Sequence, residues 1–235
     1  MKINKKLNCK DRDIKKNNYW YIFIKWILRI FFAVPLYIDY SREHKVDNKP
    51  KIFVANHLST LDPLMLMIVL PEQVSILITG GVFSIPFVGK LLAKAGHIPV
   101  YENQGRAAYN AAKEKLLRGE SVLIFPEGQL SSENGSIKKL FSGALRLSIE
   151  TNIPIVSVGI SMTKNRWIKQ KMYLGGKLEH ARFYLIGKYA VTVGSPKMFA
   201  NYMHKANHIN TITKYLLDLA AKSASRISEN AYLGA

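Results

Sequence analysis

The feature that most constrains the fold is a regular alternation of short apolar runs with longer helical runs, which begins near residue 51. The apolar runs are about four to eight residues long, the length of a buried strand. The runs between them repeat apolar residues every three or four positions, as helices that pack on one face do. This alternation predicts an α/β fold with a central, mostly parallel sheet flanked by helices.

The same patterns predict the individual elements, and glycines at 96 and 119 mark two helix ends. Strands are expected over 51–56, 74–79, 97–101, 121–125 and 153–160, and helices over 62–70, 86–96, 105–119, 143–152 and 208–227. Two later runs, 181–186 and 189–194, are expected to complete the sheet. We predict one domain over residues 49–235, preceded by a separate N-terminal segment, residues 1–48.

The N-terminal segment begins with a basic arm and continues into an aromatic, apolar run over residues 19–40, which Pro35 ends or kinks. The run approaches the length of a membrane-spanning helix. Lys25 and Arg29 lie on one helical face, however, and each charge at the bilayer centre would cost about 2.5–3.5 kcal/mol. We expect a helix lying in one leaflet, with both cations at lipid phosphates. A core helix with snorkelling cations is the alternative.

The charge of the chain indicates an anionic partner. Lys and Arg number 34 against 16 Asp and Glu, a formal net charge of +18. Anionic membrane lipids fit this charge, and we expect the protein at the cytoplasmic face of a membrane. The lack of zinc-finger or RNA-binding motifs argues against nucleic acid. The basic stretch 161–190 is either a binding surface or a solvated face. The single cysteine, Cys9, excludes an intrachain disulfide.

Two polar clusters follow predicted strands, "NHLSTLD" after 51–55 and "PEGQLS" after 121–125. Sites in parallel sheets gather beyond the carboxyl ends of the strands. In the first cluster, Asp62 followed by Pro63 predicts a helix start capped by Asp62. His57 permits a second interpretation, a general base oriented by the Asp62 carboxylate. Taken alone, these residues fit the plain cap more often, so both interpretations stay open.

The sequence carries no motif for a metal or cofactor, and none is expected. Four of the histidines, at 97, 180, 204 and 208, lack compact ligand spacing, although the last two are one helical turn apart. No phosphate-binding glycine fingerprint and no G-x-S-x-G nucleophile elbow is present. A base at His57 would therefore act directly on an acceptor hydroxyl.

Four segments in series, "NHLSTLD", "GHIPVY", "VLIFPEGQLS" and "IPIVSV", resemble the glycerolipid acyltransferases of the 1-acylglycerol-3-phosphate acyltransferase type. The resemblance covers about residues 50–200. It implies acyl transfer from acyl-CoA or acyl-carrier protein to the hydroxyl of a lysophospholipid, giving phosphatidic acid. It also implies that His57 is the base, that Asp62 orients it, and that Glu127 and Gly128 shape the acceptor site.

The chain departs from the family where basic residues are associated with the acceptor phosphate. Glu102 and Leu130 stand where arginines are usual, and Phe141 and Ser142 occupy a third, commonly basic stretch. Substitutes for these cations are expected at Arg106, Lys138 and Lys139.

Three alternatives follow from these departures and from the charge. The first keeps the chemistry but changes the acceptor to another lysolipid, a glycolipid or an aminolipid. The second is a basic, membrane-tethered binding protein without catalysis, and the third is an inactive acyltransferase scaffold.

Overall fold

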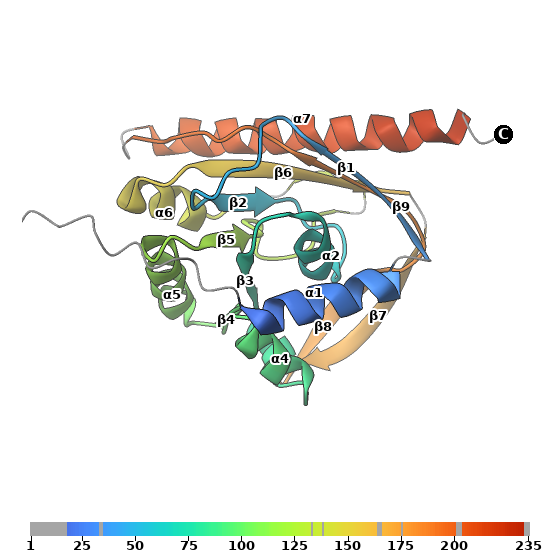
Figure 1. Ribbon diagram of the computed structural model, residues 1–235, viewed down its shortest axis with the longest axis horizontal. Helices are drawn as coiled ribbons and strands as arrows, with labels where there is room; N and C mark the ends of the chain where they lie inside the picture. The colour runs from blue at the N-terminus through green and yellow to red at the C-terminus, as the bar shows by residue number, and fades with distance from the viewer. Residues whose placement is uncertain are drawn as a thin grey trace, which may run out of the picture.

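The computed structural model describes residues 18–32, 35–132, 134–137, 139–163, 166–174, 176–200 and 204–232. The basic arm with Cys9, and also Lys138, lie outside these ranges. A seven-stranded sheet forms the centre, in the order β1-β9-β6-β2-β5-β3-β4 (Figure 1). Its strands are β1 (Leu36–Arg42), β2 (Ile52–Ala55), β3 (Val74–Thr79), β4 (Ile98–Val100), β5 (Ser121–Ile124), β6 (Ile155–Met162) and β9 (Gly187–Val193).

Helices cover both faces of this sheet (Figure 1). They are α1 (Tyr19–Phe32), α2 (Asp62–Val69), α3 (Gly80–Phe83), α4 (Val88–Lys94), α5 (Gly105–Leu117), α6 (Gly143–Thr151) and α7 (Lys205–Tyr232). Strand β2 explains why the sheet is covered twice. Its side chains alternate between two buried clusters, Phe53 packing with residues of α1 and α2, and Ile52 and Val54 with residues of α5, α6 and α7.

Neighbouring strands of the sheet run parallel except at one junction, where β9 lies antiparallel to β6. The predicted α/β fold with a mostly parallel sheet is therefore confirmed. The five strands predicted before residue 161 and the strand over 189–194 all occur, and the predicted helices begin and end within a few residues of their expected bounds. The largest difference is at α7, which spans Lys205–Tyr232 instead of 208–227.

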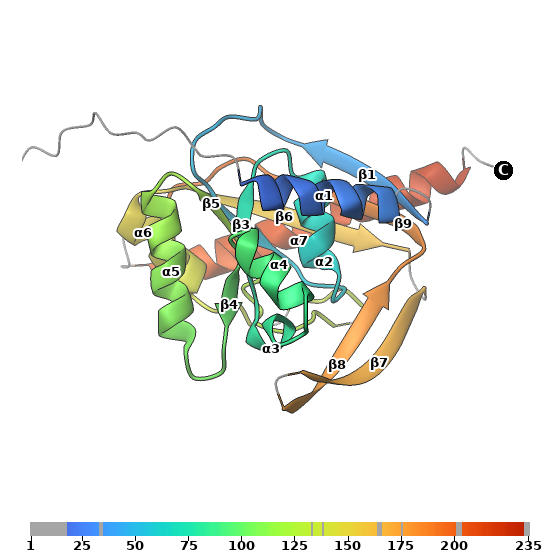
Figure 2. The same cartoon turned by 60° about the horizontal axis from the view of Figure 1, so that its bottom comes forward.

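The strand predicted over 181–186 does not join the central sheet. Residues of this run belong to β8 (Lys177–Tyr184), which pairs only with β7 (Trp167–Leu174) in a separate antiparallel hairpin. The hairpin projects away from the central sheet in both ribbon views (Figures 1 and 2). Strand β1 was also not predicted. It lies within the segment 1–48 and forms the edge of the central sheet beside β9.

Helix α1 packs against the body through Tyr21, Ile24 and Phe32, which are buried. Its two cations turn inward: Lys25 Nζ donates to the carbonyl of Leu70, and Arg29 Nη2 donates to the carbonyl of Ile68 at 3.2 Å. These carbonyls lie at the carboxyl end of α2, where the helix dipole is negative. The expectation that both cations meet lipid phosphates is therefore wrong.

The environment of these cations also changes one pKa. Burial, together with the neighbouring Arg29 guanidinium, lowers the pKa of Lys25 to about 8. Within the described residues, none of the helices has both the length and the apolar character that crossing a bilayer requires.

Candidate active site

The two polar clusters lie side by side because β2 and β5 are adjacent and parallel. His57 follows β2, and Glu127 follows β5. The backbone N–H of His57 donates to Ser131 Oγ at 3.1 Å and to Glu127 Oε1 at 3.4 Å. Ser131 Oγ in turn donates to Glu127 Oε1, and Ser131 N–H donates to the carbonyl of His57 at 2.6 Å. The loops after the two strands are thus joined directly at His57.

The side chains of His57 and Asp62 are in contact. Nδ1 of His57 lies 3.1 Å from Oδ2 of Asp62, whose side chain is completely buried, whereas 18% of the His57 side chain is exposed. Asp62 also accepts the N–H of Ser59 at 2.8 Å and the hydroxyl of Tyr189 at 2.9 Å. A carboxylate only accepts hydrogen bonds, so a neutral imidazole bonded to it carries its proton on Nδ1. In that tautomer Nε2 keeps its lone pair, as a base requires.

The start of α2 differs from the prediction in one respect. The helix begins at Asp62 and has Pro63 in its first turn, but Leu61 occupies the N-cap position and no side chain caps the helix. Both carboxylate oxygens of Asp62 are occupied by Ser59, Tyr189 and His57. The predicted helix start is right, whereas the capping role of Asp62 is wrong.

An apolar groove adjoins the His57 ring. Phe125 stacks on this ring, with 4.2 Å between the centroids and 27° between the planes. Phe125 also lines a groove of about 140 Å³ between α5, α6 and the ends of β3, β4 and β5. Its other lining residues are mostly apolar: Leu77, Val100, Gly105, Ala108, Tyr109, Ile124, Pro126, Phe141, Gly143, Ala144 and Leu147.

Gly128 has a backbone conformation that explains its residue type. Its φ of +65° lies in the left-handed region, and a Cβ there would lie 3.0 Å from the Phe141 ring. Glu127 is buried next to it and holds the His57 and Ser131 loops together through its carboxylate.

Two of the predicted cationic residues, Arg106 and Lys139, lie within the described ranges, and both are exposed. Arg106 is exposed in the first turn of α5, and Lys139 is exposed in the segment before α6. No hydrogen bond or ion pair joins either of them to His57 or Asp62 among the described residues. Leu130, which replaces a family arginine, is half-buried one residue before Ser131.

Sequence reasoning missed three residues of this site. Ser131 lies in the predicted "PEGQLS" cluster but was given no role. Tyr189 reaches Asp62 from 127 positions away. Arg182 donates through Nη2 to the carbonyl of Ser131 at 2.6 Å. Tyr189 lies in an apolar strand and Arg182 in a lysine-rich stretch, so neither carried a local signal. In the part of the chain that the structure describes, no cluster of three or more His, Cys, Asp and Glu residues could hold a metal ion.

One solved structure has a similar fold. The crystal structure of the 1-acyl-sn-glycerophosphate acyltransferase of Thermotoga maritima superposes with a TM-score of 0.60 and 19% identity, covering 86% of this chain and 78% of that one. This likeness shows the fold.

Several curated proteins match by sequence, including the following two. The lyso-ornithine lipid O-acyltransferase of Pseudomonas aeruginosa is 32% identical over 143 residues, which are 60% of this chain and 53% of that protein. The 1-acyl-sn-glycerol-3-phosphate acyltransferase of Borreliella burgdorferi is 30% identical over 137 residues, 55% of this chain and 54% of that protein. The matches thus span about half the length of these relatives.

The sequence model of one family, described as acyltransferase, matches residues 37–161, which is more than half of the chain. The matched range contains the His57–Asp62 pair, the Phe125–Gly128 loop and strands β1 to β6 except for the first residue of β1 and the last residue of β6. The chain therefore belongs to the acyltransferase family.

Proposed function

We propose that the protein transfers an acyl group from an acyl thioester, acyl-CoA or acyl-carrier protein, to the hydroxyl of a lysophospholipid. The acceptor proposed first is 1-acylglycerol-3-phosphate, which gives phosphatidic acid. The observation that carries the proposal is the contact between His57 and the buried Asp62, with Nε2 left as a base, next to an apolar groove. The named activities of the relatives from Borreliella burgdorferi and Thermotoga maritima support it.

In the proposed mechanism, Nε2 of His57 removes the proton from the acceptor hydroxyl. The oxygen attacks the thioester carbonyl, and the resulting tetrahedral intermediate collapses with loss of the thiolate. The thiolate takes the proton back from the imidazolium, so that the enzyme is restored and one ester replaces one thioester. The Asp62 carboxylate holds the ring and stabilises its charged form between these steps.

The groove beside Phe125 is the proposed site for the acyl chain. Phe125 contacts both the groove and the His57 ring, so a chain bound there would bring its carbonyl end to the base. Apolar walls of this kind bind hydrocarbon through the area they remove from water.

One relative and two residues of this chain favour a second candidate acceptor, a lysolipid without phosphate. The Pseudomonas aeruginosa relative is named for a lyso-ornithine lipid, which carries no phosphate. Glu102 and Leu130 stand where arginines would be expected to bind a phosphate. An aminolipid acceptor with the same hydroxyl chemistry is therefore the second candidate.

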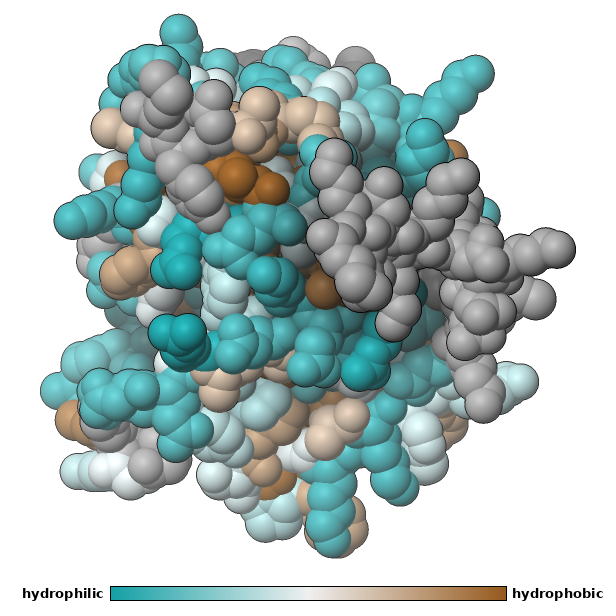
Figure 3. Space-filling model, turned by 90° about the vertical axis from the view of Figure 1, so that its left-hand side faces the viewer, coloured by the Kyte–Doolittle hydropathy of each residue, from teal (hydrophilic) through white to brown (hydrophobic). Residues whose placement is uncertain are grey.

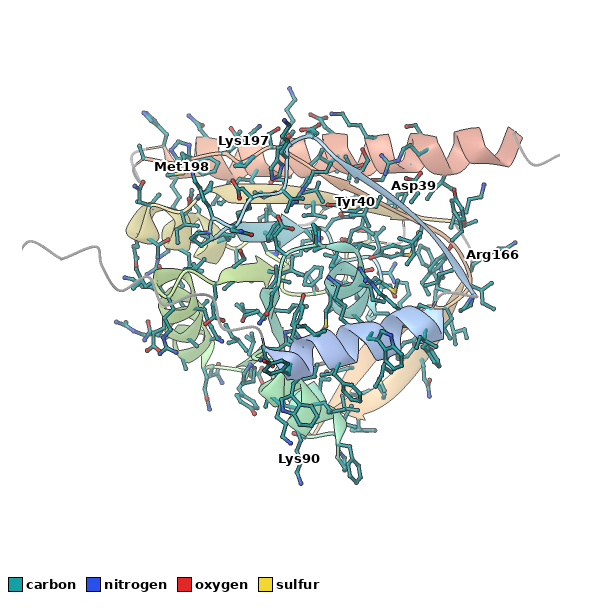
Figure 4. All side chains as sticks on the ribbon, in the orientation of Figure 1. Asp39, Tyr40, Lys90, Arg166, Lys197 and Met198 are labelled. Carbon is teal, nitrogen blue, oxygen red and sulfur yellow. The ribbon has the colours of Figure 1, made fainter. Side chains whose placement is uncertain are left out.

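We also propose that α1 docks the protein on one leaflet at the cytoplasmic face of a membrane. The outward side of the helix is apolar and exposed, including Phe23 and Trp26, the latter 60% exposed. Lys94 on the adjacent α4 lies 4.2 Å from the Trp20 ring, and Lys90 points away from the body (Figure 4). Aromatic side chains flanked by lysines suit the surface of an anionic bilayer.

The test is acyl transfer by wild-type protein and by His57→Ala with a labelled acyl donor. The acceptors are lysophosphatidic acid, lyso-ornithine lipid and uncharged monoacylglycerol. We expect turnover by the wild type and a loss of about 10²–10⁴-fold in kcat for the variant, the usual contribution of a general base. His180→Ala, an exposed histidine on β8, is the matched control and should retain activity.

Equal activity of the wild type and His57→Ala would contradict the mechanism. Failure of the wild type to use any acceptor with either donor would favour the binding protein or the inactive scaffold. Turnover of lyso-ornithine lipid without turnover of lysophosphatidic acid would select the second acceptor.

A further inference from the structure

Arg182 is a buried cation without a counter-ion next to the candidate active site. Only 6% of the residue is exposed, and its Nη1 is buried without any hydrogen-bond partner. No acidic side chain forms an ion pair with it in the described ranges of the chain. The Trp167 ring lies 5.0 Å from the guanidinium carbon, which attracts the cation but does not satisfy its free N–H group.

The comparison with Arg42 shows that the missing counter-ion is what distinguishes Arg182. The Arg42 side chain is also buried and also has N–H groups without a partner, at Nε and Nη1, but its Nη2 lies 2.7 Å from the Glu72 carboxylate, so its charge is compensated. Among the described residues, the Arg182 side chain hydrogen-bonds to the neutral carbonyl of Ser131 and to no acidic group. A guanidinium taken from water without a counter-ion is strongly unfavourable, and a buried donor without an acceptor adds to that penalty. Such groups call for a ligand that completes them.

The backbone around Arg182 ties it to the catalytic loop. The N–H of Thr60 donates to the carbonyl of Arg182 at 2.8 Å, and the N–H of Arg182 donates to Thr60 Oγ1 at 3.0 Å. The guanidinium in turn holds Ser131, whose own backbone is bonded to His57. One residue therefore separates the cation from the backbone of His57. The apolar groove lies apart from this cation, since none of its lining residues belongs to β7 or β8.

We propose that Arg182 binds the acidic group of the lysolipid acceptor, a phosphate or a carboxylate, and thereby selects charged over uncharged acceptors. This inference rests on the proposed function. In a lysolipid the acidic group lies a few bonds from the hydroxyl, whereas the whole pantetheine arm separates the phosphates of an acyl donor from its thioester. A cation one residue from His57 therefore fits the acceptor. The planar guanidinium can bind two oxygens of such a group at once.

The test compares acceptor selectivity in the wild type, Arg182→Gln and Arg182→Lys. For Arg182→Gln we expect kcat/KM to fall about 10–100-fold with lysophosphatidic acid or lyso-ornithine lipid, mainly through KM, as loss of a charge-assisted contact predicts. With monoacylglycerol the change should stay within about threefold. Arg182→Lys should be intermediate, because it keeps the charge and loses the fork. Lys169→Gln removes an exposed cation from the strand position paired with Arg182. This control should leave kcat/KM unchanged with all three acceptors.

The outcomes separate this inference from the proposed function. Equal losses with charged and uncharged acceptors, or no loss with either, would overturn the role of Arg182 while the wild type remained an active acyltransferase. Unfolding of both Arg182 variants, measured by thermal melting, would overturn it as well and assign the cation a structural role. A wild type that uses none of the acceptors would instead refute the proposed function. A loss confined to lysophosphatidic acid would restrict the site to phosphate.

Discussion

At the scale of single residues, the most consequential feature is the Asp62 carboxylate. It is completely buried and accepts from three donors, of which Ser59 and His57 are local and Tyr189 comes from β9. Burial and the adjacent Asp62 carboxylate raise the pKa of Tyr189 well above its ordinary value. The phenol therefore remains a proton donor, and it stabilises the charge that Asp62 presents to the histidine.

We expect Tyr189→Phe to lower kcat for acyl transfer about tenfold or more with little change in KM. The substitution keeps the ring and removes only a hydrogen bond to a charged group, worth about 1.5–3 kcal/mol. The measurement is steady-state kinetics with saturating acyl donor. Tyr184→Phe is the control, since Tyr184 is equally buried but its hydroxyl donates to the carbonyl of Lys188 at 2.9 Å. Equal effects of the two substitutions would show that Tyr189 contributes stability alone.

At the scale of secondary-structure elements, α1 differs from most surface helices because its cations face the body and many of its apolar residues are exposed. Lys25 and Arg29 point inward to the carboxyl end of α2, next to buried Tyr21 and Phe32. The other aromatic side chains of the helix are exposed: Tyr19, Trp20, Phe23, Trp26 and Phe31. The surface on the side of α5 and α6 is, by contrast, mainly hydrophilic, with apolar areas that are small and separate (Figure 3). The exposed apolar face of α1 therefore marks an interaction site.

If α1 docks on lipid, the double substitution Phe23→Gln and Trp26→Gln should weaken binding to phosphatidylglycerol vesicles by about tenfold or more. Each aromatic side chain contributes roughly 1.5–3 kcal/mol when fully buried in an apolar phase. Vesicle cosedimentation measures the effect, and thermal melting should stay unchanged because both side chains are exposed. Leu117→Gln, which removes an exposed apolar residue of α5, serves as the control. Unchanged cosedimentation of the double variant would move the docking surface elsewhere.

At the scale of the whole molecule, stability depends on a buried histidine outside the site. Burial, with a smaller effect of the Lys115 charge, lowers the pKa of His97 from its ordinary value of 6.5 to about 4. His97 Nδ1 accepts the N–H of Ile76 at 3.2 Å, and this bond joins the residue just before the short strand β4 to β3. The native state thus favours the neutral imidazole.

We expect the unfolding free energy to fall as the pH drops from about 6.5 to about 4. In this window the unfolded chain binds a proton at residue 97 that the native state does not, which costs about 3 kcal/mol in total. Denaturant unfolding at several pH values measures it against His97→Asn, whose Oδ1 can accept from Ile76. The wild-type curve should be steeper than that of the variant in this window. Parallel curves would mean that His97 is protonated to the same extent in both states.

The elements that could be predicted are those whose signal is local. Strand 51–56 and the helix that begins at Asp62 follow from an apolar run and from the Asp-Pro pair. Strand β1 was missed because it continues directly from the aromatic run of α1. Strand β7 was missed because its lysines indicated a basic face, either solvated or binding, and no strand. Pairing with β9 and with β8 creates these strands, and a pairing partner far along the chain leaves no local mark.

The sequence by itself determined the α/β architecture, the polar loops at the carboxyl ends of β2 and β5, and the spacing that brings Asp62 to His57. These follow from periodicity and short-range turn geometry, which act over a few residues. Only the tertiary structure decided that Asp62 serves the histidine and Tyr189 instead of capping a helix, that Lys25 and Arg29 face α2, and that Arg182 lies beside Ser131. Each of these depends on which buried polar group finds a partner, and burial is a property of the assembled chain.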